Sequence, residues 1–184
     1  MVDAEVINMS EQIQNHEADI EDINALIKVR MDKLETLCTD CENPFSEVRY
    51  ERDATSKQII ENMDVFEGKY VSLCGRLMSK RGMGKVSFCD LRDNEGKIQL
   101  YTQIDEIGED RYAKYQKLDI GDIIGVKGEV FITKRGEISI RVKEYTLLAK
   151  SLRPLPEKFH GLTNQDLRYR MRYLDMIVNP DVKD

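Results

Sequence analysis

Three side chains in the sequence combine types and positions suited to holding a nucleic-acid base: Phe88, Gln99 and Glu137. The stretch KVSFCDLRDNEGKIQLY (85–101) alternates apolar and polar residues on either side of a turn. It predicts two strands that present Phe88 and Gln99 outward. An exposed aromatic ring stacks on a base with about 1–3 kcal/mol, and a carboxamide offers a donor and an acceptor. Glu137, outward on a later strand, would accept a hydrogen bond from a base, although a carboxylate weakens attraction to phosphate.

Basic side chains surround these positions and would hold the backbone of a bound strand. Arg76, Arg81, Lys85 and Arg141 lie on or beside the same predicted strands. The alternative is a solvated barrel face on which Phe88 only covers apolar surface, and patterning alone leaves both interpretations open. The candidate nucleic-acid-binding site comprises Arg76, Arg81, Phe88, Gln99, Glu137 and Arg141.

The segments that must position these residues show a period of two from Tyr70 onward. We expect a loop at 79–84, a helix over 105–118, a strand over 121–132 and a final strand after the turn at 134–136. Three strands, a helix and two strands is the order of the OB-fold, a five-stranded Greek-key barrel. Its strand 2–3 face commonly binds oligonucleotides. An SH3-like barrel would lack the helix, so the predicted fold class is mainly β with α.

Helical patterns flank the predicted barrel. Apolar residues at three- and four-residue steps predict a helix over 10–37, whose stripe would pack on its own domain or form a dimer or partner surface. A short helix is expected within 55–63, and another over 165–178 after the proline-containing linker 152–156. The chain thus divides into an N-terminal helical appendage (1–67), an OB-fold domain (68–150), and a linker with a C-terminal helix (151–184).

The net charge of −6 is unevenly distributed along the chain. Residues 1–67 hold 17 acidic and 6 basic side chains, whereas residues 68–184 hold 17 acidic and 22 basic ones. The whole-chain charge disfavours nucleic acid because like charges repel, but the split leaves a basic module with an acidic appendage. The sequence has no apolar run long enough for a membrane span and no apolar secretory segment at its start. We therefore expect a cytoplasmic location and no membrane partner.

The sequence offers little for catalysis or metal binding. It has 2 histidines, no Walker loop, no G-x-G-x-x-G after a strand and no zinc-protease helix, so no residue receives a catalytic role. Cys38 and Cys41 form a C-x-x-C pair, but a tetrahedral zinc site needs two more ligands and none lies near in the sequence. We expect two free thiols at a helix end, and no metal or cofactor for this chain.

Two long motifs resemble the class II lysyl-tRNA synthetase family. The segment SLRPLPEKFHGLTNQDLRYRMRYLDMIVNP (151–180) is similar to the join between that family's anticodon-binding and catalytic domains. The segment GRLMSKRGMGKVSFCDLRDNEGKIQLY (75–101) is similar to its first three barrel strands. KRGEISIRVKEYTLLAKSLRPLP (134–156) resembles its last strand, and IKVRMDKLETL (27–37) more loosely its N-terminal helix. The clear match covers about residues 68–180.

The resemblance implies that the barrel binds the anticodon loop of tRNA(Lys), whose central base is uracil. It puts Phe88 at an aromatic that stacks on an anticodon base. It puts Gln99 and Glu137 at positions that hydrogen-bond the uracil edge, where N3–H lies between two carbonyl oxygens. Arg76 and Arg81 match basic positions that approach the anticodon loop.

For the parent protein, the resemblance implies a homodimeric ligase that attaches lysine to tRNA using ATP and magnesium. We expect the present chain to be inactive alone, because class II motif 1 only begins near its end and motifs 2 and 3 are absent. Two alternatives stay open. One is the barrel of an aspartyl or asparaginyl synthetase, which the PLPEKFHG segment (154–161) disfavours. The other is a stand-alone OB-fold module for protein association through the helix at 10–37.

Overall fold

The computed structural model describes residues 2–40, 42–156, 165–179 and 182 of the 184-residue chain. These residues form two compact units. One comprises residues 1–30 and 152–184, and the other comprises residues 31–151. Each unit is described by itself below.

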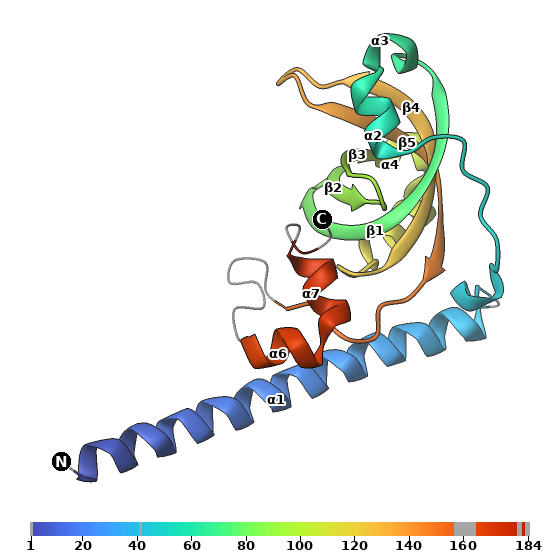
Figure 1. Ribbon diagram of the computed structural model, residues 1–184. Coiled ribbons are helices and arrows are strands. Elements are labelled where there is room, and N and C mark those ends of the chain that lie inside the picture. Colours follow the sequence, from blue (N-terminus) through green and yellow to red (C-terminus); the bar gives the residue numbers. More distant parts are fainter. Residues whose placement is uncertain (1, 41, 157–164, 180–181, 183–184) are drawn as a thin grey trace. The chain divides into compact units, whose positions relative to one another are not determined.

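The unit of residues 31–151 is built around a closed β-barrel with strand order β1-β2-β3-β5-β4 (Figure 1). All neighbouring strands are antiparallel except β3 and β5, which pair in parallel. Two short helices, α4 and α5, follow β3, so the predicted five-stranded OB-fold with its helix before the fourth strand is confirmed. The elements are β1 (Tyr70–Met83), β2 (Val86–Arg92), β3 (Lys97–Gln103), α4 (Ile104–Ile107), α5 (Glu109–Gln116), β4 (Ile123–Ile132) and β5 (Ile138–Ala149).

The barrel interior follows from the alternation of the strands. Along β2 and β3, buried residues alternate strictly with half-buried or exposed ones, because successive side chains point to opposite faces. Leu91 and Leu100 are fully buried, and α5 adds Tyr115 to the same core. The outward positions of Phe88 and Gln99, predicted from parity, are confirmed.

β1 is longer than the sequence pattern predicts, and the loop expected at 79–84 was wrong. The strand continues to Met83, and the turn is confined to Gly84 and Lys85. A register shift between Leu77 and Ser79 inserts one extra residue, a β-bulge, which breaks the alternation on which the prediction depended. The extension matters for the site, because it brings the end of β1 alongside β2.

The single helix expected over 105–118 is divided at Gly108. This residue has φ +84, a left-handed conformation that glycine adopts without steric cost and that ends α4. The short helix expected within 55–63 is confirmed as α2 (Ser56–Glu61), and a further short helix, α3 (Met63–Phe66), follows it.

Asp93 fastens α2 to the turn between β2 and β3. Its carboxylate accepts hydrogen bonds from the Ser56 backbone N–H at 2.6 Å and the Ser56 hydroxyl at 2.7 Å. It also accepts from the backbone N–H groups of Glu95 and Gly96, each at 2.8 Å. Burial raises the pKa of Asp93, but these hydrogen bonds outweigh it and hold the pKa below its ordinary value.

The other unit contains most of the long helix α1 (Val2–Thr39), together with α6 (Gln165–Arg170) and α7 (Arg172–Val178). The predicted helix at 10–37 is confirmed and is longer at both ends. The helix expected over 165–178 is interrupted at Met171. In α7, the buried carboxylate of Asp175 accepts from Arg168 Nε and Arg172 Nη1, both at 3.0 Å. These two arginines therefore serve the packing of the short helices.

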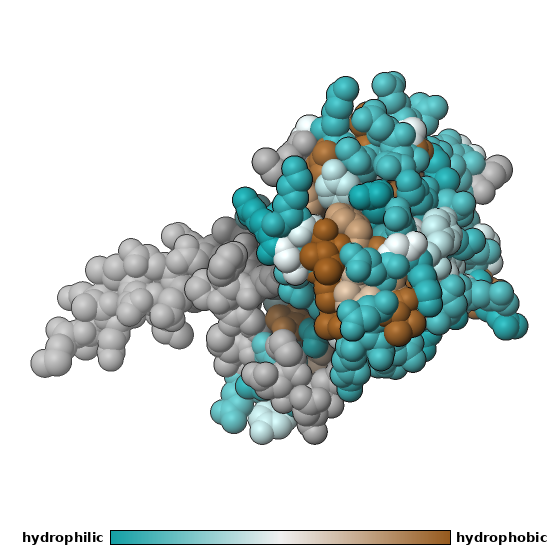
Figure 2. Space-filling model, turned by 90° about the horizontal axis from the view of Figure 1, so that it is seen from above, coloured by the Kyte–Doolittle hydropathy of each residue, from teal (hydrophilic) through white to brown (hydrophobic). Residues whose placement is uncertain are grey.

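Several large apolar side chains are exposed among the described residues, including Val48, Val65 and Ile60. Figure 2 shows one face on which hydrophilic residues cover most of the area and hydrophobic residues surface in small groups. Among the helices of the described residues, none combines the length and the apolar character that crossing a membrane requires.

Candidate nucleic-acid interface

A row of side chains crosses the outer face of the barrel from β1 to β4. Arg81 lies opposite Phe88, Phe88 opposite Tyr101, Tyr101 opposite Arg141, and Arg141 opposite Glu129. The ring centroids of Phe88 and Tyr101 lie 5.1 Å apart at an interplanar angle of 54°. This row gives two half-buried aromatic rings with an arginine on each side, an arrangement that suits the stacking of an unpaired base.

Gln99 lies in the next row of the same face, opposite Asp90 on β2 and Ser139 on β5. The Ser139 hydroxyl donates a hydrogen bond to Gln99 Oε1 at 3.0 Å, and Ser139 is buried. This bond occupies the carbonyl oxygen of the amide and leaves its N–H₂ group to donate to a ligand.

Glu137 is exposed at the start of the β5 side of the β4–β5 turn. Its N–H donates to Thr133 Oγ1 at 3.0 Å, and its carbonyl accepts from the Thr133 N–H at 2.9 Å. Since β3 and β5 are parallel with Gln99 opposite Ser139, Glu137 lies one row beyond Gln99. Phe88, Gln99 and Glu137 therefore form a diagonal across β2, β3 and β5.

Arg76 lies two rows away from Phe88, opposite Arg92 on β2 and Ile123 on β4. Its Nη1 donates to the Gly121 carbonyl at 2.8 Å. Burial lowers the pKa of its guanidinium, against the opposing attraction of Asp122. The side chain thus supports the connection that leads into β4, and its predicted role in binding nucleic acid stays a prediction.

Three further residues of this face were not in the predicted site. Tyr101 on β3, and Glu129 and Phe131 on β4, point outward by the alternation of their strands. Phe131 approaches Tyr101 with centroids 5.7 Å apart. The sequence carries this signal: Val126 and Val130 are apolar residues at alternate positions, both are buried, and a period of two therefore points Glu129 and Phe131 outward.

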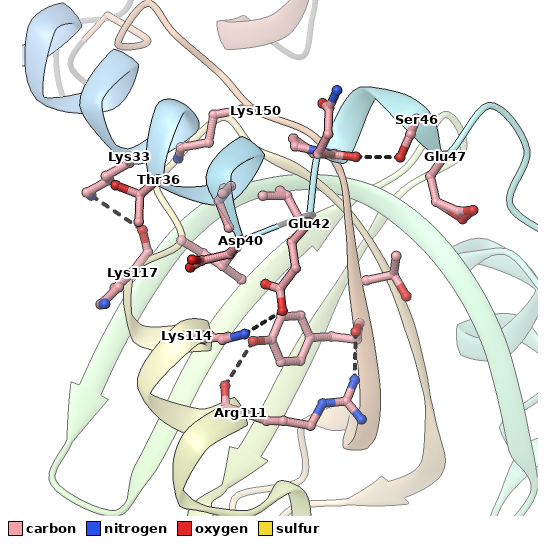
Figure 3. A pocket seen from close by; sticks show the side chains of 17 residues that line it. Lys33, Thr36, Asp40, Glu42, Ser46, Glu47, Arg111, Lys114, Lys117 and Lys150 are labelled. Carbon is pink, nitrogen blue, oxygen red and sulfur yellow. Dashed lines mark hydrogen bonds and ion pairs between the residues drawn. The ribbon is translucent and has the colours of Figure 1, made fainter.

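A separate cavity of about 660 Å³ lies between the last turns of α1, the short 3-10 helix η1 (Pro44–Ser46), α5 and β5 (Figure 3). Lys114 pairs with Glu42 across it. Arg111 Nη2 donates to the Tyr145 carbonyl at 3.0 Å, and the Tyr145 hydroxyl donates to the Arg111 carbonyl at 2.9 Å. Burial raises the pKa of Tyr145 to about 12, with Arg111 opposing and Glu42 adding to the rise. These polar groups satisfy one another: the Arg111–Tyr145 bonds join α5 to β5, and the Lys114–Glu42 pair joins α5 to the segment that follows α1.

The described residues include no cluster of three or more His, Cys, Asp or Glu side chains able to hold a metal ion. Cys38 is an exposed free thiol, whereas its predicted companion Cys41 lies outside the described residues. The PLPEKFHG segment also lies mostly outside them, in the range 157–164.

Comparison with known proteins shows what the barrel and the chain around it are similar to. Residues 71–148 match a tRNA anticodon family described as an OB-fold nucleic acid binding domain. The chain is 52% identical over 163 residues to the lysine–tRNA ligase of Clostridium novyi (strain NT), covering 89% of the chain and 32% of that protein. It is 49% identical over 176 residues to the lysine–tRNA ligase of Thermoanaerobacter sp. (strain X514), covering 96% of the chain and 35% of that protein.

The barrel is thus an OB-fold nucleic acid binding domain, in which the outer face of β2, β3 and β5 carries the candidate site. Over 89% to 96% of its length, the chain is similar to part of the lysine–tRNA ligases, the lysyl-tRNA synthetases. It spans about a third of the length of these relatives.

Proposed function

We propose that this chain binds the anticodon loop of tRNA(Lys) through the outer face of its barrel, as the anticodon-binding part of a lysyl-tRNA synthetase. The observation that carries the proposal is the diagonal formed by Phe88 on β2, Gln99 on β3 and Glu137 just before β5. It places a stacking ring, an amide donor and a carboxylate acceptor on one face, the kinds of groups with which proteins read unpaired RNA bases.

Uracil fits these three groups better than cytosine does. The amide N–H₂ of Gln99, freed by the Ser139 bond to Oε1, can donate to a uracil carbonyl. The Glu137 carboxylate can accept from uracil N3–H. Cytosine presents an acceptor at N3, which would face the carboxylate without a proton between them, so one pair of groups would be left unsatisfied.

The basic residues of the face supply attraction to the backbone. Arg81, at the end of β1, is exposed beside Phe88, and Lys85 is exposed in the following turn. Contacts of this kind position a strand without reading its sequence and weaken as salt concentration rises. Affinity should therefore depend on salt, whereas the preference for uracil should not.

For the whole protein we propose the reaction named in its relatives, attachment of lysine to tRNA, by a homodimer that uses ATP and magnesium. Among the described residues, no cluster of His, Cys, Asp or Glu side chains fits the magnesium ion. The expected cytoplasmic location stays a prediction.

The test is a titration of the 184-residue protein with an RNA hairpin whose loop carries UUU, and with the same hairpin carrying UCU. We expect the single change from uracil to cytosine to weaken binding about tenfold, the effect of losing one or two hydrogen bonds. Equal affinities would contradict the proposed recognition. Hairpins carrying GUC and GUU, the aspartate and asparagine anticodons, compare the related synthetases; tighter binding to either would favour the alternative.

A further inference from the structure

Aromatic rings on the outer face extend beyond Phe88. The Tyr101 and Phe131 centroids lie 5.7 Å apart at 66°, an edge-on contact, although Phe131 belongs to β4 and β5 lies between β4 and β3. The β5 residue opposite Phe131 is Ser139, whose small side chain leaves room for the two rings to meet. The face therefore carries a continuous series of rings from β2 to β4.

Arg141 lies over one ring of this series, Phe131. Its guanidinium carbon lies 4.8 Å from the centre of the Phe131 ring, and its Nη1 lies 3.2 Å from Glu129 Oε2. The Arg141 and Glu129 side chains are 34% and 37% exposed, and an ion pair this exposed adds little to stability. Its effect is to fix the orientation of the guanidinium at the surface.

We infer that Tyr101, Phe131 and Arg141, oriented by Glu129, form a second nucleotide subsite, which stacks the base next to the one on Phe88. The inference rests on the proposed function and extends it to the flanking base. Guanidinium planes and aromatic rings are the groups on which proteins stack unpaired RNA bases. Arg141 lies two strands away from Phe88, which at about 4.8 Å per strand separates the two platforms by roughly 10 Å.

A contact to phosphate explains the arrangement less well. Glu129 takes one edge of the Arg141 guanidinium and places a negative charge where a phosphate would have to approach. The guanidinium face that lies away from Phe131 stays available to a base. Glu129 and Phe131 are accordingly positioning residues, and Arg141 is the residue that contacts the base.

The experiment uses the full chain and four UUU hairpins: one intact, and three in which the central, preceding or following base is removed to leave an abasic nucleotide. Affinities are measured for the wild type and for the Phe88→Ala, Phe131→Leu and Arg141→Lys variants. In the wild type, each stacked base that is removed should weaken binding about tenfold. We call this loss of affinity the penalty at that base. Phe88→Ala should abolish the penalty at the central base. Phe131→Leu and Arg141→Lys should abolish it at one flanking base and keep the central penalty.

The second subsite is wrong if Arg141→Lys and Phe131→Leu leave both flanking penalties at their wild-type size, or if Arg141→Lys weakens all four hairpins equally. In both cases a retained central penalty would leave the proposed function intact. A wild-type protein that binds none of the hairpins would overturn the proposed function and the subsite together. Thermal melting confirms that each variant folds.

Glu129→Gln separates positioning from attraction. The variant removes a negative charge near the RNA backbone, so binding of the intact hairpin should become tighter at low salt. The flanking penalty should shrink at the same time, because an amide oxygen without the carboxylate charge holds the guanidinium less firmly. Tighter binding with an unchanged flanking penalty would contradict the positioning role of Glu129.

Discussion

The Ser139 hydroxyl donates to Gln99 Oε1 at 3.0 Å across the parallel pairing of β5 with β3. The bond fixes which end of the Gln99 amide is free, and so which hydrogen bond this side chain offers to a base. Ser139 is not proposed to contact the base, but by orienting the Gln99 amide it determines which hydrogen bond Gln99 can make to the base.

Replacing Ser139 with Ala tests this relationship. The amide would lose its fixed orientation, so the ratio of affinities for UUU and UCU hairpins should fall several-fold, while the cost in stability stays near 1 kcal/mol. Ser46→Ala, at an exposed serine on η1, is the control and should change neither quantity. An unchanged ratio in Ser139→Ala would show that Gln99 does not depend on this bond.

Phe88→Ala should weaken binding of the UUU hairpin by about 1–3 kcal/mol, because it removes the stacking surface. The matched control is Phe45→Ala, since Phe45 is 51% exposed on η1, outside the barrel strands. Fluorescence anisotropy with both variants measures the difference. A similar loss in both, or none in either, would count against stacking on Phe88.

Asp93→Asn should destabilise the chain at neutral pH by about 1–3 kcal/mol, because an N–H₂ group would then face backbone and hydroxyl donors. The pKa of Asp93 is lowered in the folded state, so its stabilising effect is present above the ordinary value of 3.8 and is lost as pH falls through the lowered folded value.

Urea denaturation at several pH values measures this effect. The difference between wild type and Asp93→Asn should shrink as the pH falls below about 4. Asp64→Asn, at an exposed aspartate of α3, is the control and should leave stability unchanged. A difference that stays constant down to pH 3 would mean that the charge of Asp93 does not contribute.

Gly128→Ala should disturb the strands that carry Glu129 and Arg141. A Cβ atom at Gly128 would lie 2.1 Å from the Arg141 carbonyl oxygen, so the backbone of β4 or β5 would have to move. We expect a loss of more than about 1 kcal/mol in stability, together with weaker RNA binding. At Gly82, the same substitution meets nothing within 4 Å, and Gly82→Ala should be nearly neutral. Equal melting temperatures for the two variants would contradict this account of Gly128.

The order of strands and helices could be predicted because each element has a clear period in the sequence. Phe88 and Gln99 could be placed outward for the same reason, since β2 and β3 alternate without interruption. The extension of β1 could not be predicted, because a bulge near Met78 interrupts the alternation of that strand. The pairing of Arg81 with Phe88 depends on that extension.

Other features of the site depend on which strands are neighbours. The meeting of Tyr101 with Phe131, the ion pair of Arg141 with Glu129 and the bond of Arg76 to Gly121 each join residues well separated along the chain. The alternation of apolar and polar residues predicts only on which face of a strand a residue lies. It cannot predict contacts between strands or their distances.

The most direct test of anticodon reading is the affinity ratio for UUU and UCU hairpins, measured in the wild type and in Glu137→Gln at the same salt concentration. A glutamine at 137 can accept from uracil N3–H or donate to cytosine N3, so the ratio should collapse towards one. Glu144→Gln removes a carboxylate from the same strand, where it pairs with Lys127, and should keep the wild-type ratio. A Glu137→Gln variant that still prefers uracil as strongly as the wild type does would contradict the proposed recognition.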